Sequence, residues 1–121
     1  MIVLDTNVFI YLSNGTLAHQ IVIDTDIAHA SVTKIEALGF SSIPANELLL
    51  LGALFSESYS LELTDSIVER AITLRQGKRM SLGDSIIAAT ALEHGLILWT
   101  ANIDDFSRIE GLKLINPLNL K

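Results

Sequence analysis

Acidic side chains recur in this sequence where predicted strands end and predicted helices begin. Asp5 ends the first predicted strand, Glu36 lies near the start of the helix after the second strand, and Asp84 lies at the start of a later helix. One amide and two more carboxylates follow the last clear strand: Asn102, Asp104 and Asp105. If the fold gathers these side chains at one edge, their charges repel and their pKa values rise unless a cation compensates. Oxygen ligands without thiolates favour Mg²⁺ or Mn²⁺, which activate water and stabilise a phosphodiester transition state.

The same acids also fit a purely structural role as helix caps. Residues 33–36 and 81–84 both match the capping-box pattern, in which the acid accepts a hydrogen bond from a free amide at a helix start. Asp5 is similarly placed to cap the helix that follows it. One detail favours an ion site: Asp84 precedes Ile87 and Ala88 on the face that becomes buried, where an unpaired carboxylate is costly. The residues by themselves leave both interpretations open.

Short strands alternate with helices along the chain. Apolar, β-prone runs predict strands over residues 2–4, 27–32, 58–63, 96–99 and 112–115. Helical spacing and capping residues predict helices that start at Thr6, Thr33, Pro44, Thr64 and Ser81. The alternation predicts an α/β fold, a small parallel sheet sandwiched between helices, in a single domain over residues 1–121. Ligands of such sheets bind outside the carboxyl ends of the strands, where Asp5 lies.

Composition excludes several other classes of protein. Half of the residues are apolar and 18% are charged, which is typical of a packed core and not of disorder. The lack of cysteine excludes disulfides, thiolate zinc sites and cysteine nucleophiles. The longest apolar run, residues 48–55, is far short of the roughly 20 residues that span a bilayer. With no basic region ahead of an apolar one at the N-terminus, we expect no membrane segment, no secretory signal and a cytoplasmic location.

The charge balance opposes a nucleic-acid partner. The formal net charge is −6, and Lys34 is the only lysine or arginine in residues 1–62. Phosphate neutralisation by basic side chains normally dominates nucleic-acid affinity, so any such partner needs a compensating source of positive charge.

Four segments, taken in order, carry a family resemblance: residues 2–8 (IVLDTNV), 33–36 (TKIE), 81–88 (SLGDSIIA) and 99–106 (WTANIDDF). They resemble the ordered motifs of PIN-domain ribonucleases, in particular the VapC-type toxins of prokaryotic toxin–antitoxin pairs. The resemblance covers nearly the whole chain. It implies a Mg²⁺- or Mn²⁺-dependent endoribonuclease whose cations would also answer the charge objection.

The resemblance implies which acids are catalytic. Asp5, Glu36 and Asp84 match the three acids with which the family holds metal. The fourth position departs from the family pattern, because many relatives carry an acid where this chain has Asn102. Asp105, or Asn102 through water, is therefore expected to complete the site.

The resemblance also implies roles for neighbouring polar residues. Thr6 and Thr100 match hydroxyl positions that orient ligands or water, and a strand-end cap is the alternative for each. Asp104 is expected to be solvated. Three basic residues shortly before Asp84 are candidate RNA phosphate contacts, or else a solvated helix end: Arg75, Lys78 and Arg79.

The resemblance and one apolar run indicate which partners this protein binds. Relatives act on RNA, form homodimers and bind an antitoxin whose tail covers an apolar groove and blocks the acidic site. Residues 48–55 fit a buried helix, but so many apolar residues exceed one buried face, and the surplus predicts a patch for a partner. The alternative function is a PIN-like module that binds protein or RNA without cutting it.

Overall fold

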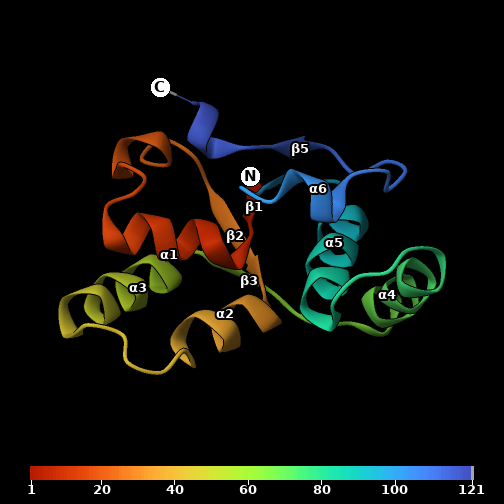
Figure 1. The fold of residues 1–121 in the computed structure, drawn as a ribbon, viewed down its shortest axis with the longest axis horizontal. Coiled ribbons are helices and arrows are strands. Elements are labelled where there is room, and N and C mark those ends of the chain that lie inside the picture. The colour runs from red at the N-terminus through yellow and green to blue at the C-terminus, as the bar shows by residue number, and fades with distance from the viewer. Residues whose placement is uncertain (121) are drawn as a thin grey trace.

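Five short parallel strands form one sheet within residues 1–120, the part of the chain that the computed structural model describes (Figure 1). The strands are β1 (Ile2–Leu4), β2 (Ile27–Ala30), β3 (Tyr59–Leu61), β4 (Ile97–Trp99) and β5 (Leu114–Ile115). Their order across the sheet is β3-β2-β1-β4-β5. The chain therefore builds outward from β1 in one direction and then crosses to its other side, which makes the carboxyl end of β1 a topological switch point.

Helices cover both faces of this sheet (Figure 1). They are α1 (Thr6–Asn14), α2 (Ser31–Leu38), α3 (Ala45–Glu57), α4 (Asp65–Gly77), α5 (Leu82–His94) and α6 (Ile103–Phe106), with 3-10 turns at His19–Ile21 and Pro117–Asn119. Helices α1 and α3 pack on one face, α5 and α6 pack on the other, and α2 contacts both α1 and α5. None of the helices in residues 1–120 is long and apolar enough to cross a membrane.

The central strand β1 is buried on both faces, as its apolar sequence requires. Successive side chains of a strand point to opposite faces. Leu4 accordingly packs in the cluster with Phe9 of α1 and Phe55 of α3, whereas Val3 packs in the cluster with Ile87 of α5. Such two-sided burial is typical of parallel sheets and fixes where the residue after β1 must lie.

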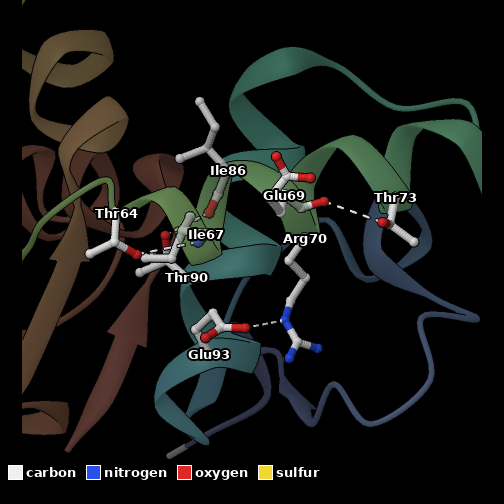
Figure 2. Close-up of polar contacts among 8 residues, drawn as sticks. All are labelled: Thr64, Ile67, Glu69, Arg70, Thr73, Ile86, Thr90 and Glu93. Atoms are coloured by element: carbon white, nitrogen blue, oxygen red, sulfur yellow. Dashed lines mark hydrogen bonds and ion pairs between the residues drawn. The ribbon is translucent and has the colours of Figure 1, made fainter.

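Helix α4 packs mainly against α5 (Figure 2). Ile67 and Ala71 of α4 are buried against Ala89 of α5. Arg70 Nε also donates to Glu93 Oε1 across the two helices at 2.7 Å. That ion pair is largely solvent-exposed and is worth at most about 1 kcal/mol, so apolar packing is the main force that fixes α4.

The predicted α/β fold with a small parallel sheet between helices is confirmed, with local corrections. The predicted strand 27–32 is too long, because α2 begins at Ser31. Glu36 lies inside α2, so the capping box predicted for residues 33–36 is wrong. The β-branched Val32 favours a strand locally, but burial of Thr33 and Ala37 as one helical face overrides that preference. The helix α6 was not predicted.

Candidate active site

Asp5 follows β1 directly and is almost completely buried, at 4% exposure. Its Oδ1 accepts a hydrogen bond from the Thr6 amide at 2.8 Å, which caps α1. Its Oδ2 accepts from the Thr100 hydroxyl at 2.8 Å. Thr100 follows β4, which pairs with β1, so the register of the sheet brings the two side chains together. Burial raises the pKa of Asp5, and these two hydrogen bonds partly oppose that rise.

Glu36 reaches the same edge of the sheet from α2. The Thr6 hydroxyl donates to Glu36 Oε1 at 2.7 Å. The Thr6 and Thr33 hydroxyl oxygens lie 3.4 Å apart, and Thr33 is fully buried one turn before Glu36. Thr6 thus bonds to both acids, through its amide to Asp5 and through its hydroxyl to Glu36.

Asp84 lies in the first turn of α5, where Ser81 is the N-cap. The Asp84 amide donates to Ser81 Oγ at 3.1 Å, so half of the predicted capping interaction is present. The Asp84 carboxylate is half-buried, and its pKa is raised to about 6, first by burial and then by repulsion from Asp5, Asp105 and Glu36. The hydrogen bond with Ser81 lowers this pKa, so capping does not explain the rise, whereas three neighbouring carboxylates are what a cation site would gather.

Asn102 and Asp105 both lie near these acids, Asn102 just before α6 and Asp105 within it. Asn102 precedes α6, and its amide donates to Thr100 Oγ1 at 3.0 Å, so Thr100 orients Asp5 and also caps this loop. Asp105 is exposed, yet its charge raises the pKa of both Asp5 and Asp84. Asp104 is also exposed, as expected for a solvated residue, and does not contribute to those shifts.

A cavity of about 250 Å³ joins most of these groups. It is lined by Asp5, Thr6, Asn7, Ile10, Glu36, Phe40, Asp84 and Asn102. Asp105 and Asp104 line a neighbouring cavity that shares Asn102. Asn7 and Phe40 line this cavity although no sequence pattern marked them as site residues, and Phe40 is 67% exposed.

The basic residues lie apart from this cavity. None of Arg75, Lys78 and Arg79 lines it. Arg75 instead borders an apolar groove between α4 and α5, together with Leu82. The segment that carries these bases leads directly into α5, so it ends next to the turn that holds Asp84.

The donor set fits a hard divalent cation. Every side chain that contributes is an oxygen donor, and three neighbouring carboxylates add their repulsion to the effect of burial in raising the pKa of Asp84. Within residues 1–120, however, no group of three or more acidic, histidine or cysteine side chains is placed to hold one ion directly. Mg²⁺ keeps several waters and binds proteins through one or two carboxylates, which matches this looser arrangement.

The chain is therefore an α/β domain whose candidate active site consists of carboxylates at the carboxyl edge of a parallel sheet. The profile of the PIN domain matches residues 2–112, and the chain belongs to the PIN-domain family.

Proteins with known names and solved structures resemble this chain over almost its whole length. Ribonuclease VapC1 of Rickettsia felis is 26% identical, with 94% of each chain covered. A toxin–antitoxin complex from Klebsiella pneumoniae matches with a TM-score of 0.75 and 25% identity over 97% of this chain and 98% of the other. VapBC2 of Rickettsia felis, bound to a promoter DNA fragment, matches with a TM-score of 0.79 and 24% identity over 96% and 98%.

Proposed function

We propose that this chain is a Mg²⁺- or Mn²⁺-dependent endoribonuclease, a single domain over residues 1–121 that acts in the cytoplasm as the toxin of a toxin–antitoxin pair. The observation that carries the proposal is the cluster of Asp5, Glu36, Asp84 and Asp105, in which burial first and repulsion between the carboxylates second raise the pKa of Asp5 and Asp84. The similarity to a protein named as a ribonuclease and to a toxin–antitoxin complex supports the choice of substrate and partner.

The acids have complementary tasks in this proposal. Asp5, Glu36, Asp84 and Asp105 would hold the cation, and Asn102 would contribute through water. When bound, the cation would supply positive charge for the phosphoryl oxygens and lower the pKa of water.

The threonines hold the acids in place. The Thr100 hydroxyl holds one oxygen of Asp5, and Thr6 holds the other oxygen of Asp5 and one of Glu36. Asp84, which lines the cavity, would orient the attacking water for in-line attack at phosphorus, and the bond from phosphorus to the 3′ oxygen would break to leave 5′-phosphate and 3′-hydroxyl ends. Arg75, Lys78 and Arg79 would contact RNA phosphates outside the cavity.

The proposal predicts metal-dependent cleavage of a mixed RNA pool by the purified protein. We expect cutting with Mg²⁺ or Mn²⁺, none with EDTA, and a loss of at least about 100-fold in Asp84→Asn, since changes even to outer-sphere partners of metal ligands cost 10- to 100-fold. Asp65→Asn is the matched control, because Asp65 also lies in the first turn of a helix but is exposed and lies outside the site.

Each outcome of this experiment discriminates between functions. Cleavage that survives in Asp84→Asn contradicts the assigned site. Absence of both cleavage and calorimetric Mn²⁺ binding in the wild-type protein contradicts the nuclease and leaves Asp5 as the N-cap of α1 and Asp84 as a first-turn residue of α5. A PIN-like module that binds protein or RNA without cutting would then be favoured.

We further propose that apolar surface on α2 and α3 contacts protein partners. In α3, Leu51, Leu54 and Phe55 are buried, whereas the surplus apolar residues are exposed: Leu48, Leu49 and Leu50. An apolar cavity of about 150 Å³ beside α3 shares Ile10 and Phe40 with the acidic cavity. A partner segment that fills the first cavity would therefore reach the second, which supports an antitoxin tail that blocks the site.

The exposed leucines of α3 are assigned to a homodimer contact. Leu49 is 78% exposed, so Leu49→Glu is expected to leave the fold of each monomer intact while it disrupts the dimer. Light scattering at micromolar concentration should give a dimer for the wild-type protein and a monomer for the variant. A monomeric wild-type protein, or a variant that stays dimeric, would contradict this assignment.

A further inference from the structure

Gly83 lies where any side chain would collide with Glu36. A Cβ atom built on Gly83 would come within 2.6 Å of Glu36 Oε2, 3.2 Å of its Cδ and 3.4 Å of its Oε1. Real Cβ atoms essentially never approach a neighbour closer than 3.0 Å. The Glu36 carboxylate therefore occupies the volume that a side chain at position 83 would need.

Space, and not backbone conformation, accounts for glycine at this position. Gly83 lies in the first turn of α5 and does not have a positive φ, unlike Gly15, Gly95 and Gly111. Glycine is a weak helix former, so alanine would suit the helix better. The three atoms nearest to a Cβ built at Gly83 all belong to Glu36, so alanine would disturb this contact first.

We propose that Gly83 is a positioning residue, whose missing side chain lets the Glu36 carboxylate lie against the first turn of α5, beside Asp84. The inference rests on the proposed nuclease function. Thr6 holds Oε1 at 2.7 Å from one side, and the open space at Gly83 receives Oε2 on the other. Thus α1 holds one oxygen of the carboxylate, and the first turn of α5, distant in sequence, leaves room for the other.

A methyl group at position 83 would move the carboxylate without unfolding the protein. The clashing atoms belong to the far end of a flexible side chain, which rotates away at little cost. Rotation of Glu36 would break its hydrogen bond from Thr6 and withdraw its charge from Asp84. The substitution therefore changes the position of the Glu36 carboxylate while it leaves the stability of the fold intact.

The test compares Gly83→Ala with Gly52→Ala. Gly52 lies in α3, and a Cβ there meets nothing within 4 Å, so the control gains a helix former without a clash. For Gly83→Ala we expect Mn²⁺ affinity by calorimetry to fall at least about 10-fold and RNA cleavage to fall about 100-fold. The melting temperature should stay at or above that of the wild-type protein, and Gly52→Ala should bind and cleave normally.

A double-mutant cycle shows whether Gly83 acts through Glu36. If it does, Gly83→Ala has no further effect on Mn²⁺ affinity in a Glu36→Ala background. Equal losses in both backgrounds, or a wild-type protein that cleaves no faster than Gly83→Ala, would overturn the inference. A wild-type protein that neither binds Mn²⁺ nor cleaves RNA overturns the proposed function itself, and the inference with it.

Discussion

Replacement of Asp84 with asparagine is expected to stabilise the metal-free protein at neutral pH while it removes the nuclease activity. The pKa of Asp84 rises from its usual 3.8 to about 6 in the folded protein, so folding favours the protonated carboxyl. Between these two pH values the folded state binds more protons than the unfolded state, and stability falls as pH rises. Above pH 6 the full penalty for the charged, repelled carboxylate is present.

The size of the stabilisation expected for Asp84→Asn follows from the pKa shift of Asp84 and from the exposure of its side chain. A shift of this size is worth about 3 kcal/mol, since each unit corresponds to about 1.4 kcal/mol. Asp84 is half-exposed, so solvent screening reduces the expected gain to about 1 to 2 kcal/mol. For a domain of this length that gain raises the melting temperature by about 5 °C.

The measurement is urea unfolding in EDTA from pH 4 to pH 8, as the difference between the wild-type protein and Asp84→Asn. The difference should grow as pH rises from about 4 and level off above the raised pKa. His29 contributes to the pH dependence of stability with the opposite sign. Burial lowers its pKa, so the stability that it contributes is lost as pH falls through its titration. That contribution is common to both proteins and cancels in the difference.

Two controls sharpen this prediction. Asp65→Asn, in the first turn of α4, should lower stability slightly because it removes a favourable charge from a helix N-terminus. Mn²⁺ at pH 7.5 should raise the melting temperature of the wild-type protein and leave Asp84→Asn nearly unchanged. A destabilised Asp84→Asn with no pH dependence in the difference would mean that Asp84 is only a cap.

Replacement of Thr100 with valine is expected to destabilise the protein by about 2 to 3 kcal/mol at pH 7. The Thr100 hydroxyl donates to the buried Oδ2 of Asp5 and accepts from the Asn102 amide. Valine has the same shape but leaves a buried carboxylate oxygen and an amide without this partner. Hydrogen bonds to charged groups are worth about 1.5 to 3 kcal/mol, and an unsatisfied buried partner costs a similar amount.

Urea unfolding of Thr100→Val and Thr100→Ser separates the hydroxyl from the methyl group. Serine keeps the hydroxyl and should lose only about 1 kcal/mol for the missing methyl. The deficit of the valine variant should shrink as pH falls and Asp5 takes up a proton, because the unpaired charge then disappears. Equal losses in the two variants would mean that the bond between Thr100 and Asp5 contributes little.

Local rules predicted the elements and several of their ends correctly. The apolar run of β1 ends at Asp5, Ser81 and Thr64 cap α5 and α4 through their hydroxyls, and Gly95 ends α5 with a positive φ of 63°. These features depend on residues within a few positions of one another, so the sequence carries them directly. The alternation of strands and helices then predicts a parallel sheet and places Asp5 at its carboxyl edge.

The surplus of apolar residues in α3 was predicted from the sequence only in part. The sequence predicts that 48–55 exceeds one buried helical face, which the exposed Leu48 to Leu50 confirm. Which residues face outward depends on how α3 rotates against α1, and that is set by the stacking of Phe9 on Phe55, with ring centroids 4.3 Å apart. A count of apolar residues shows that some of them must be exposed, but it does not show which ones.

Only the tertiary structure decided how the acids are held. The bond from Thr100 to Asp5 joins residues 95 positions apart, and the bond from Thr6 to Glu36 joins residues 30 positions apart. Both depend on the register of β1 against β4 and β2, which no local pattern encodes. Glu36 matched a capping box in the sequence, whereas the fold places it inside α2 against Gly83. The sequence by itself determined that Asp5 lies at a strand end and Asp84 at a helix start, because these features are local. Their distances and pKa values come from packing between distant segments, since burial and charge repulsion exist only once the chain has folded.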